Sequence, residues 1–373
     1  MESGTGQYGS AHSRWAGVGP YYAMFPIDFA DDVVRRYTEP GDLVLDPFAG
    51  RGTAVFSASA QQRVGIGVEI NPVGWVYANA KLAPARHDAV AARIRELGKV
   101  ADSYVLEAVQ LPDFFHHCFS LQVRQFLVAA RSLLRWRDSQ LDRTVMALLL
   151  VYLHGKRGAA LSNQMRQAKS MAPDYAVRWW KERDLKPPDL DPIDFLVRRL
   201  KWRYAKGKPC DRQSRVLLRD SVECLPKLRQ AVERGRMARV RLLLTSPPYY
   251  GVTNYHYDQW LRIWLLGGAP NALRPEERGE HRDKFENIVK YQRLLDTVFG
   301  EAAGMMARGA TVYVRTDRRE ATLEATHQSL CKTFPRWRIR KYNRPFTRPT
   351  QTQLFGDGSA KVGEVDLVVR AQS

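Results

Sequence analysis

The sequence has little cysteine and no long apolar run, and these absences exclude several classes of protein. Its four cysteines are scattered, with no C-x-x-C pair among Cys118, Cys210, Cys224 and Cys331. Neither a disulfide framework nor a zinc site is predicted, and no metal ligands are expected. The scattered cysteines fit a reducing cytoplasm, where we expect the protein to be. No apolar run approaches the ~20 residues of a membrane span, so no membrane partner is expected. Residues 1–19 lack a signal core and are rich in Gly and Ser, which predicts a flexible amino terminus.

Acidic residues are few relative to basic ones. The 373 residues include 58 Lys and Arg against 39 Asp and Glu, which gives a formal net charge of +19 and a pI near 9.9. Residues 86–215 alone hold 25 Lys and Arg against 14 Asp and Glu, a net charge of +11. Such a charge favours a polyanionic partner over a small-molecule substrate, because phosphate contacts supply affinity that does not depend on sequence.

Residues 43–69 have the strand–turn–helix pattern of a nucleotide-binding motif. A short apolar strand, residues 43–45, precedes an acid and a glycine-rich turn, residues 46–53 (DPFAGRGT), and a helix over residues 54–61. The glycines let the backbone approach a ligand closely. The phosphate-loop ending and a full G-x-G-x-x-G are both missing, so the predicted ligand is an adenosyl group without a pyrophosphate. A second strand ends at Glu69, about twenty residues beyond the turn, where an acid binds a ribose hydroxyl pair in this type of fold.

A second motif, TSPPY, occupies residues 245–249 directly after the apolar run 240–244. Two consecutive prolines cannot continue a central strand, so the strand must end there. A small hydroxyl, two fixed carbonyls and an aromatic ring then sit together at the carboxyl end of a buried strand. In open α/β sheets, this is where ligands bind.

The two motifs together resemble those of the S-adenosylmethionine-dependent DNA methyltransferases that modify exocyclic amino groups, N4 of cytosine or N6 of adenine. The resemblance covers about residues 20–84 and 212–370. It implies an α/β, Rossmann-like methyltransferase fold, in which a mostly parallel seven-stranded sheet has one antiparallel strand. The last strand, residues 364–369, is expected to be that antiparallel strand, at the edge of the sheet.

The resemblance also implies S-adenosyl-L-methionine as cofactor and assigns the residues that bind it. Asp220 is implied as the acceptor for the adenine amino group. Met24 stands where the family usually has a lysine, which puts in doubt a charge contact from that position to the methionyl carboxylate. The implied cofactor-binding residues are Phe25, Pro26, Asp46, Pro47, Phe48, Gly50, Gly52, Thr53, Glu69, Ile70, Asn71, Asp220 and Ser221.

The catalytic residues implied are Ser246, Pro247, Pro248 and Tyr249. The Ser246 side chain and the Pro247 carbonyl are expected to accept hydrogen bonds from the target amino group and to turn its lone pair toward the methyl group, so that catalysis comes mainly from positioning. Tyr249 is expected to stack on a base flipped out of the duplex. Methylation of cytosine C5 needs a thiolate nucleophile, and the usual Pro-Cys pair is absent.

Ser-Pro-Pro-Tyr is more typical of N4-cytosine enzymes in this family, and Asp-Pro-Pro-Tyr of N6-adenine enzymes. We therefore predict a site-specific N4-cytosine methyltransferase acting on double-stranded DNA, with N6-adenine as the alternative. An RNA methyltransferase and a non-catalytic DNA-binding protein on a degenerate fold are further alternatives. A nucleoid-associated prokaryotic enzyme with a cognate restriction endonuclease as candidate partner fits the resemblance. Neither the recognition sequence nor the oligomeric state is predicted.

The chain is expected to divide into a flexible segment (1–19), a catalytic domain (20–85 and 212–373) and an insertion (86–211). Helices are predicted in the insertion over residues 88–109, 121–136, 142–154 and 192–204. Its charge and its aromatic residues predict a target-recognition role. The candidate DNA contacts are the base readers Asn163, Gln164 and Arg166 of a polar loop, the basic pair Arg178 and Lys181, and Tyr250.

Overall fold

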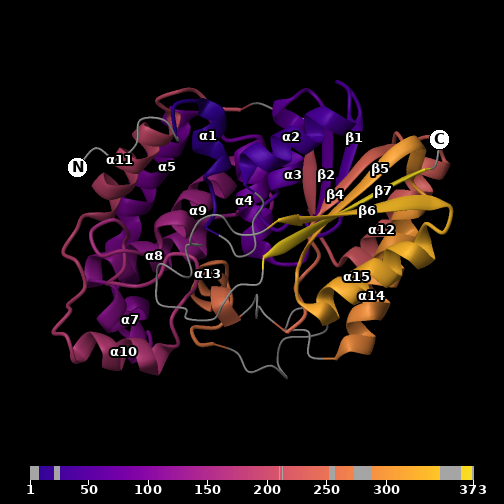
Figure 1. The fold of residues 1–373 in the computed structure, drawn as a ribbon. Helices are drawn as coiled ribbons and strands as arrows, with labels where there is room; N and C mark the ends of the chain where they lie inside the picture. The colour runs from indigo at the N-terminus through magenta and orange to yellow at the C-terminus, as the bar shows by residue number, and fades with distance from the viewer. Residues whose placement is uncertain are drawn as a thin grey trace.

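The computed structural model of the protein describes residues 8–20, 26–209, 211, 213–251, 257–272, 287–344 and 363–371. A twisted sheet occupies one half of the molecule and a block of helices the other (Figure 1). The strands are β1 (Leu43–Asp46), β2 (Val64–Glu69), β3 (Arg215–Leu218), β4 (Val240–Thr245), β5 (Met306–Asp317), β6 (Trp337–Arg344) and β7 (Glu364–Ala371). The helices are α1 (Ala11–Ala16), α2 (Ile27–Tyr37), α3 (Thr53–Ala60), α4 (Pro72–Leu82), α5 (His87–Val100), α6 (Val105–Val109), α7 (Asp113–Cys118), α8 (Leu121–Leu133), α9 (Gln140–Tyr152), α10 (Pro173–Lys181), α11 (Pro192–Tyr204), α12 (Ser221–Glu233), α13 (Trp260–Leu265), α14 (Ile288–Ala303) and α15 (Glu320–Thr333), with short 3-10 turns η1 (Ala101–Tyr104) and η2 (Tyr257–Gln259).

The seven strands lie in the order β3-β2-β1-β4-β5-β7-β6. β1 pairs in parallel with β2 and β4, β2 with β3, and β4 with β5, whereas β7 runs antiparallel to both β5 and β6. This is the mostly parallel, Rossmann-like sheet with one antiparallel strand that the sequence predicts, and the fold class is confirmed. The expectation that β7 forms the edge is wrong, because β7 lies between two neighbours.

The edge strand is β6, which the sequence analysis does not predict. Its sequence is WRIRKYNR, and six of its eight residues are exposed. A strand at an edge pairs on one side only, and positive charge on it discourages pairing with another chain. Because β6 is exposed and basic, it has too few apolar residues to show the alternation of apolar and polar residues that predicts a strand.

Buried side chains alternate between the two faces of the central strands. Leu43 and Leu45 of β1 belong to the apolar cluster under α12, α14 and α15, and Val44 between them belongs to the cluster under α2 and α3. Successive side chains of a strand point to opposite faces. Both faces of the sheet are therefore covered by helices, as in doubly wound folds.

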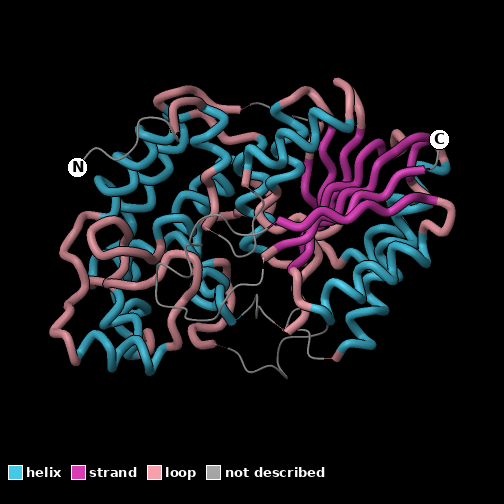
Figure 2. Tube along the Cα trace, viewed as in Figure 1, coloured by secondary structure: helices cyan, strands magenta, loops and turns pink. Residues whose placement is uncertain are grey.

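The helical half is not separated from the sheet half by a linker. Side chains of α5 to α11 form one continuous buried cluster with α1, α4 and α13. The ring of Trp264 in α13 lies 4.5 Å from that of Phe115 in α7, and the ring of Trp260 lies 4.9 Å from that of Phe114, measured between ring centroids. Figure 2 shows the strands gathered on one side of this shared core and only helices and loops on the other.

Several predicted helices have different ends in the structure. The helices expected over 121–136 and 142–154 are observed as α8 and α9, with ends shifted by two or three residues. The helix expected over 88–109 is broken after Val100 by η1, and α6 follows it. The residue pattern over 285–308 also predicts one long helix. In the structure this helix, α14, ends at Ala303, because β5 begins at Met306 and the N–H of Val240 donates to the carbonyl of Met305. Residues 306–308, which helical periodicity alone assigns to the helix, therefore belong to strand β5.

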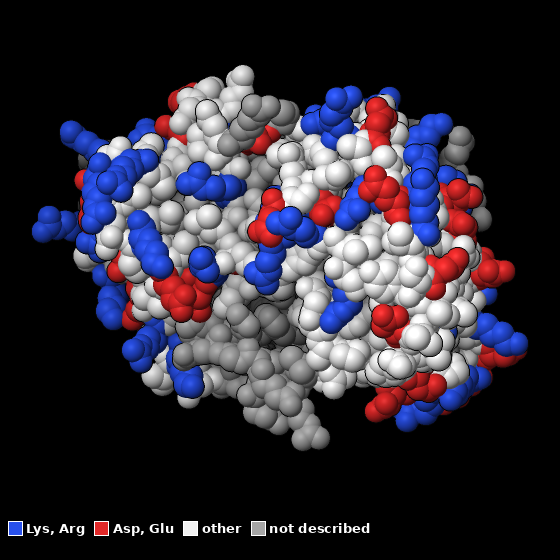
Figure 3. Space-filling view, turned by 180° about the vertical axis from the view of Figure 1, so that it is seen from behind, with Lys and Arg blue, Asp and Glu red and all other residues white. Residues whose placement is uncertain are grey.

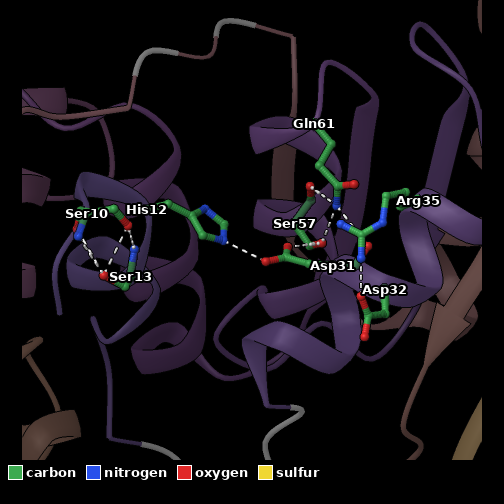
Figure 4. A network of polar contacts seen from close by, with 8 residues as sticks. All are labelled: Ser10, His12, Ser13, Asp31, Asp32, Arg35, Ser57 and Gln61. Carbon is green, nitrogen blue, oxygen red and sulfur yellow. Dashed lines mark hydrogen bonds and ion pairs between the residues drawn. The ribbon is translucent and has the colours of Figure 1, made fainter. Parts of the chain in front are cut away.

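The expectation of a flexible amino terminus is wrong for residues 10–18. Helix α1 begins with a capping box between Ser10 and Ser13, and Trp15 is buried. His12 Nε2 lies 2.8 Å from Asp31 Oδ2, and the Ser57 hydroxyl donates to Asp31 Oδ1 at 2.6 Å (Figure 4). Asp31 therefore ties α1 to α2 and α3, which a composition rich in Gly and Ser does not reveal.

Candidate active site

The predicted motifs meet at one edge of the sheet, where the parallel strands end. Asp46 is the last residue of β1, Glu69 of β2 and Thr245 of β4. Because β7 is antiparallel, its first residue, Glu364, lies at this same edge, opposite Asp317 of β5. Ligands of open α/β sheets bind at this edge.

The glycine-rich turn has the backbone conformation that its glycines predict. Gly50 and Gly52 have φ angles of 52° and 74°, in the left-handed region that favours glycine. A Cβ atom on Gly52 would lie 2.7 Å from the Cβ atom of Ala78 in α4. The close approach at Gly52 is therefore to helix α4, whereas the motif predicts a close approach to a ligand.

Two buried carboxyl groups flank this turn. Asp46 and Glu69 are 2% and 8% exposed. Burial raises the pKa of Asp46 to about 7, against the lowering effect of hydrogen bonds from Thr245 and from the N–H of Phe48. Burial likewise raises the pKa of Glu69 to about 7; hydrogen bonds from the N–H groups of Asn71 and Gly50 lower it. Among the described residues, neither acid forms an ion pair.

The implied cofactor fits these residues. S-Adenosylmethionine carries ribose hydroxyl donors and a positive charge, and two buried acids that have no cation partner in the described part of the chain suit such a ligand. Glu69 accepts from Gly50 N–H at 2.6 Å and from Asn71 N–H at 2.7 Å, and these bonds fix its carboxylate beside the turn.

The other predicted cofactor residues mostly build the walls of this region. Ser221 donates its hydroxyl to the carbonyl of Pro47, which joins the turn to α12. Asp220 and Asn71 are N-caps that accept from Val222 and Val73 N–H, both at 2.9 Å. The caps place both side chains at the active-site ends of their helices.

The remaining predicted cofactor residues differ in exposure. Thr53 is buried as the first residue of α3, and Phe48 and Ile70 are half-buried. Pro26 is exposed at the N-cap of α2. Phe25 lies outside the described residues.

The two sequence motifs are joined by a direct side-chain contact. The hydroxyl of Thr245 donates to Asp46 Oδ1 at 2.7 Å, between residues 199 positions apart. Thr245 is fully buried. Because β4 pairs with β1, with Leu45 opposite Leu243, the TSPPY motif begins directly beside the acid of the glycine-rich turn.

Ser246 and Tyr249 come together, and they meet an acid that the sequence analysis missed. The Ser246 hydroxyl lies 3.4 Å from the Tyr249 hydroxyl, which donates to Glu364 Oε1 at 3.3 Å. Pro247 is buried, and Pro248 and Tyr249 are half-buried. An acid at the start of the last strand is the signal that could have identified Glu364.

The polar loop between α9 and α10 does not present Asn163 to a partner. Asn163 is fully buried, and its amide group donates to the carbonyls of His117 and Leu185 at 3.1 and 2.7 Å. The prediction that Asn163 reads a base is therefore wrong. Gln164 is half-buried and its Oε1 accepts from Arg157 N–H at 2.9 Å, whereas Arg166 is exposed.

The same loop is bonded to the segment that follows the TSPPY motif. Arg262 of α13 is fully buried and donates to the carbonyls of Leu150 and Gln167 at 2.9 and 2.5 Å. Lys169 Nζ lies 2.6 Å from Asp258 Oδ1. The insertion and the catalytic half are therefore connected by ordered polar contacts as well as by the apolar core.

The basic pair Arg178 and Lys181 lies in a groove of mixed charge between α7 and α10. The groove has a volume of about 510 Å³, and Asp113, Asp174 and Glu182 also line it. Helix α10 lies at the end of the molecule that is far from the sheet (Figure 1). Any contact of this pair with DNA would therefore fall outside the immediate surroundings of the motif residues.

Tyr250, the last candidate DNA contact, packs on the sheet half. Its ring centroid lies 5.8 Å from that of Tyr291 in α14, and it adjoins the apolar cluster on that face. The ring thus has a structural role whatever else it contacts.

Positive charge is not confined to the insertion. Lys and Arg side chains lie over both halves of the face in Figure 3. On β6, Arg338, Arg340 and Lys341 are exposed.

No described helix is long and apolar enough to span a bilayer.

Comparison with known proteins gives one family-model match and two short matches to curated relatives. A DNA methylase family model, that of the N6 and N4 methyltransferases, matches residues 4–74. Over 54 residues the chain is 39% identical to the type II methyltransferases M.Cfr9I of Citrobacter freundii and M.XycI of Xanthomonas campestris pv. cyanopsidis. These alignments cover 14% of this chain and 18% of each relative, so the chain is matched over less than a fifth of the relatives' length.

The solved structures give weaker likenesses. TrmN from Thermus thermophilus is 11% identical with a TM-score of 0.35, and the alignment covers 97% of this chain and 52% of that one. The rRNA methyltransferase aviRa from Streptomyces viridochromogenes is 14% identical with a TM-score of 0.34, over 96% of this chain and 92% of that one. At such scores these likenesses carry no argument, and the fold assignment rests on the strand order. The match of residues 4–74 supports the resemblance to the amino-DNA methyltransferases, without distinguishing N4 from N6 enzymes.

Proposed function

We propose that the protein is an S-adenosylmethionine-dependent methyltransferase that modifies the exocyclic N4 amino group of cytosine in double-stranded DNA. The observation that carries the proposal is the hydrogen bond between Thr245 and Asp46. It puts the residues proposed to hold the cofactor next to those proposed to hold the target. Methyl transfer requires this proximity, because donor and acceptor must be held together in one orientation.

The bound cofactor would supply an electrophilic methyl group on a sulfonium centre. Glu69 is proposed to accept hydrogen bonds from the ribose hydroxyls and Asp220 from the adenine amino group. The lone pair of the target amino group is delocalised into the ring, which makes this group a poor nucleophile. Ser246 Oγ and the Pro247 carbonyl are proposed to accept its hydrogens, which orients the lone pair. No side chain of the motif acts as a strong base.

The ring of Tyr249 is proposed to stack on the extruded base. An amino group inside a duplex is out of reach, so the base must leave the stack. Stacking on an aromatic side chain is worth about 1–3 kcal/mol in single-strand binders. The assignment to cytosine rests on serine as the first residue of Ser-Pro-Pro-Tyr, and an N6-adenine product would be its alternative.

DNA is proposed as the partner because of the net charge of +19 and the family match of residues 4–74. The names of the two relatives make a cognate restriction endonuclease a candidate partner.

Transfer of tritiated methyl groups to duplex DNA and to tRNA tests the proposal. We expect labelled DNA, unlabelled tRNA, and N4-methylcytosine after digestion to nucleosides. Labelled N6-methyladenine would overturn the choice of base, and labelled tRNA would overturn the choice of nucleic acid. The Ser246→Ala variant is the control, since it should lower the methyl-transfer rate and leave cofactor affinity unchanged.

A further inference from the structure

Glu364 contacts the proposed catalytic residues, although it is 115 positions away from Tyr249 in the chain. It begins β7, and the reversed direction of this strand brings its first residue to the edge where β4 ends. The hydroxyls of Ser246 and Tyr249 and the carboxylate of Glu364 form a row, with oxygen–oxygen distances of 3.4 and 3.3 Å. Such contacts are often long without substrate and shorten when it binds.

The Glu364 carboxylate is held from behind by an ion-pair network. Arg315 Nη1 lies 3.5 Å from Glu364 Oε2, and the same guanidinium donates to Asp366 at 2.7 and 3.0 Å. Asp366 is fully buried and also accepts from Arg344 at 2.8 Å. Arg315 lies over the ring of Phe29, 3.5 Å from its centroid. These contacts fix where the carboxylate points.

An ionised carboxylate only accepts hydrogen bonds, so it decides the direction of the whole row. Tyr249 must donate its hydroxyl proton to Glu364, and the lone pairs of the Tyr249 oxygen then receive the proton of Ser246. Ser246 Oγ is left with lone pairs and without a proton to offer. Hydrogen bonds in such a chain polarise one another, which makes this oxygen a better acceptor.

We propose that Glu364 is a positioning residue that acts through Tyr249, holding its ring beside Ser246 and directing the Ser246 lone pairs to the target amino group. The proposal rests on the proposed function, because it presumes an amino group at Ser246. A purely structural role would be to hold β7 against β5 through Arg315. A direct role would be contact between Glu364 and the base.

Single-turnover methyl transfer with saturating duplex DNA and cofactor separates these roles. Tyr249→Phe and Glu364→Ala should each lower the rate about three- to tenfold, the effect of one hydrogen bond. The double variant should be no slower than the slower single variant. Additive losses would overturn the proposal in favour of direct contact with the base. DNA affinity should change little in either single variant.

Glu364→Gln distinguishes the proposal from the structural role. Glutamine keeps an acceptor for Tyr249 but loses the charge that pairs with Arg315. The proposal expects Glu364→Gln to recover most of the rate lost in Glu364→Ala, and equal losses in the two variants would contradict it. Glu320→Gln, the same change at an exposed acid at the start of α15, is the control and should keep the wild-type rate.

A measurement without substrate keeps this test independent of the proposed function. In protein labelled with carbon-13 at tyrosine Cζ, the Tyr249 resonance is the one missing from Tyr249→Phe. It should move in Glu364→Ala and stay in Glu320→Gln. An unmoved resonance would overturn the contact even in an active enzyme. Wild-type protein that methylates no DNA would overturn the proposed function, and the role of Glu364 in it, whereas the resonance would still report the contact.

Discussion

Two regions of this molecule contain buried polar side chains, and the two regions differ in the partners that these side chains have. In the insertion, Asn163 and its neighbours donate to backbone carbonyls, and Arg262 does the same at the junction with α13. At the strand ends, Asp46 and Glu69 are also buried and accept hydrogen bonds, yet among the described residues no cation pairs with them. Both carboxyl pKa values are raised to about 7 by burial.

We propose that this difference separates structural burial from burial at a binding site. A buried polar group with all its partners stabilises one conformation, whereas a buried acid with hydrogen bonds but no nearby cation costs stability and suits a site that a ligand completes. The amino-acid composition does not distinguish the two regions, because each is a polar segment between apolar ones. Only the partners of each side chain distinguish the insertion loop from the edge of the sheet.

The largest effect is expected from a substitution at Gly52, which shapes the turn between the two buried acids. Gly52→Ala should destabilise the fold by about 2–5 kcal/mol, through left-handed strain and the overpacking against Ala78, and should abolish cofactor binding. Thermal unfolding and calorimetry measure both effects. Gly41→Ala is the control, because Gly41 also has a positive φ of 88° but its Cβ would meet nothing within 4 Å. A stable Gly52→Ala protein that binds the cofactor would contradict the described geometry.

A smaller effect is expected at Asn163, on the other side of the comparison. Asn163→Ala should lower the free energy of unfolding by about 2–3 kcal/mol, since buried carbonyls lose their donors. The choice of target base should stay unchanged in the folded protein. Arg166→Ala, at an exposed position of the same loop, should keep stability within about 0.5 kcal/mol and weaken DNA binding. A changed base preference in Asn163→Ala would restore it as a base reader.

The raised pKa values give a pH dependence of opposite sign for stability and for binding. Without cofactor, the folded protein holds protons on Asp46 and Glu69 that the unfolded chain loses near pH 4, so their contribution to stability falls as pH rises from about 4 to about 7. Cofactor binding needs acceptors, so affinity should rise over pH 6 to 8, by about tenfold per pH unit below 7 for each proton released. Calorimetry at several pH values measures this. Glu69→Gln should bind more weakly with a flatter profile, and a flat wild-type profile would refute the assignment.

The smallest effect is expected at the groove between α7 and α10. If Arg178 contacts a phosphate, Arg178→Gln should reduce the slope of log affinity against log salt by about 0.9. Asp174→Asn in the same groove should strengthen DNA binding, because it removes a repulsive charge. Fluorescence anisotropy at several salt concentrations measures both. Unchanged slopes in both variants would mean that the groove does not meet the DNA.

The sequence predicts those parts of the site that local pattern encodes. The turn at Gly50 and Gly52 and the strand before Ser246 lie where the motifs place them, because positive φ and consecutive prolines leave the backbone few alternatives. Helix α11 has the predicted bounds, residues 192–204. The edge strand β6 and the docked helix α1 were missed. Both depend on partners distant in sequence, β7 for the one and Asp31 and the insertion for the other.

By itself, the sequence determines the order along the chain of the two motifs, of the strands that precede them and of their acids, since these follow from residue type and spacing. Only the tertiary structure decides which of these groups meet. Thr245 reaches Asp46 because β4 pairs with β1, and Glu364 reaches Tyr249 because β7 runs against its neighbours. The tertiary fold also turns Asn163 into a buried support and leaves Glu69 without a cation partner among the described residues. Whether a side chain is buried, and which groups it contacts, depend on how distant segments pack together, and a local sequence pattern does not contain this information.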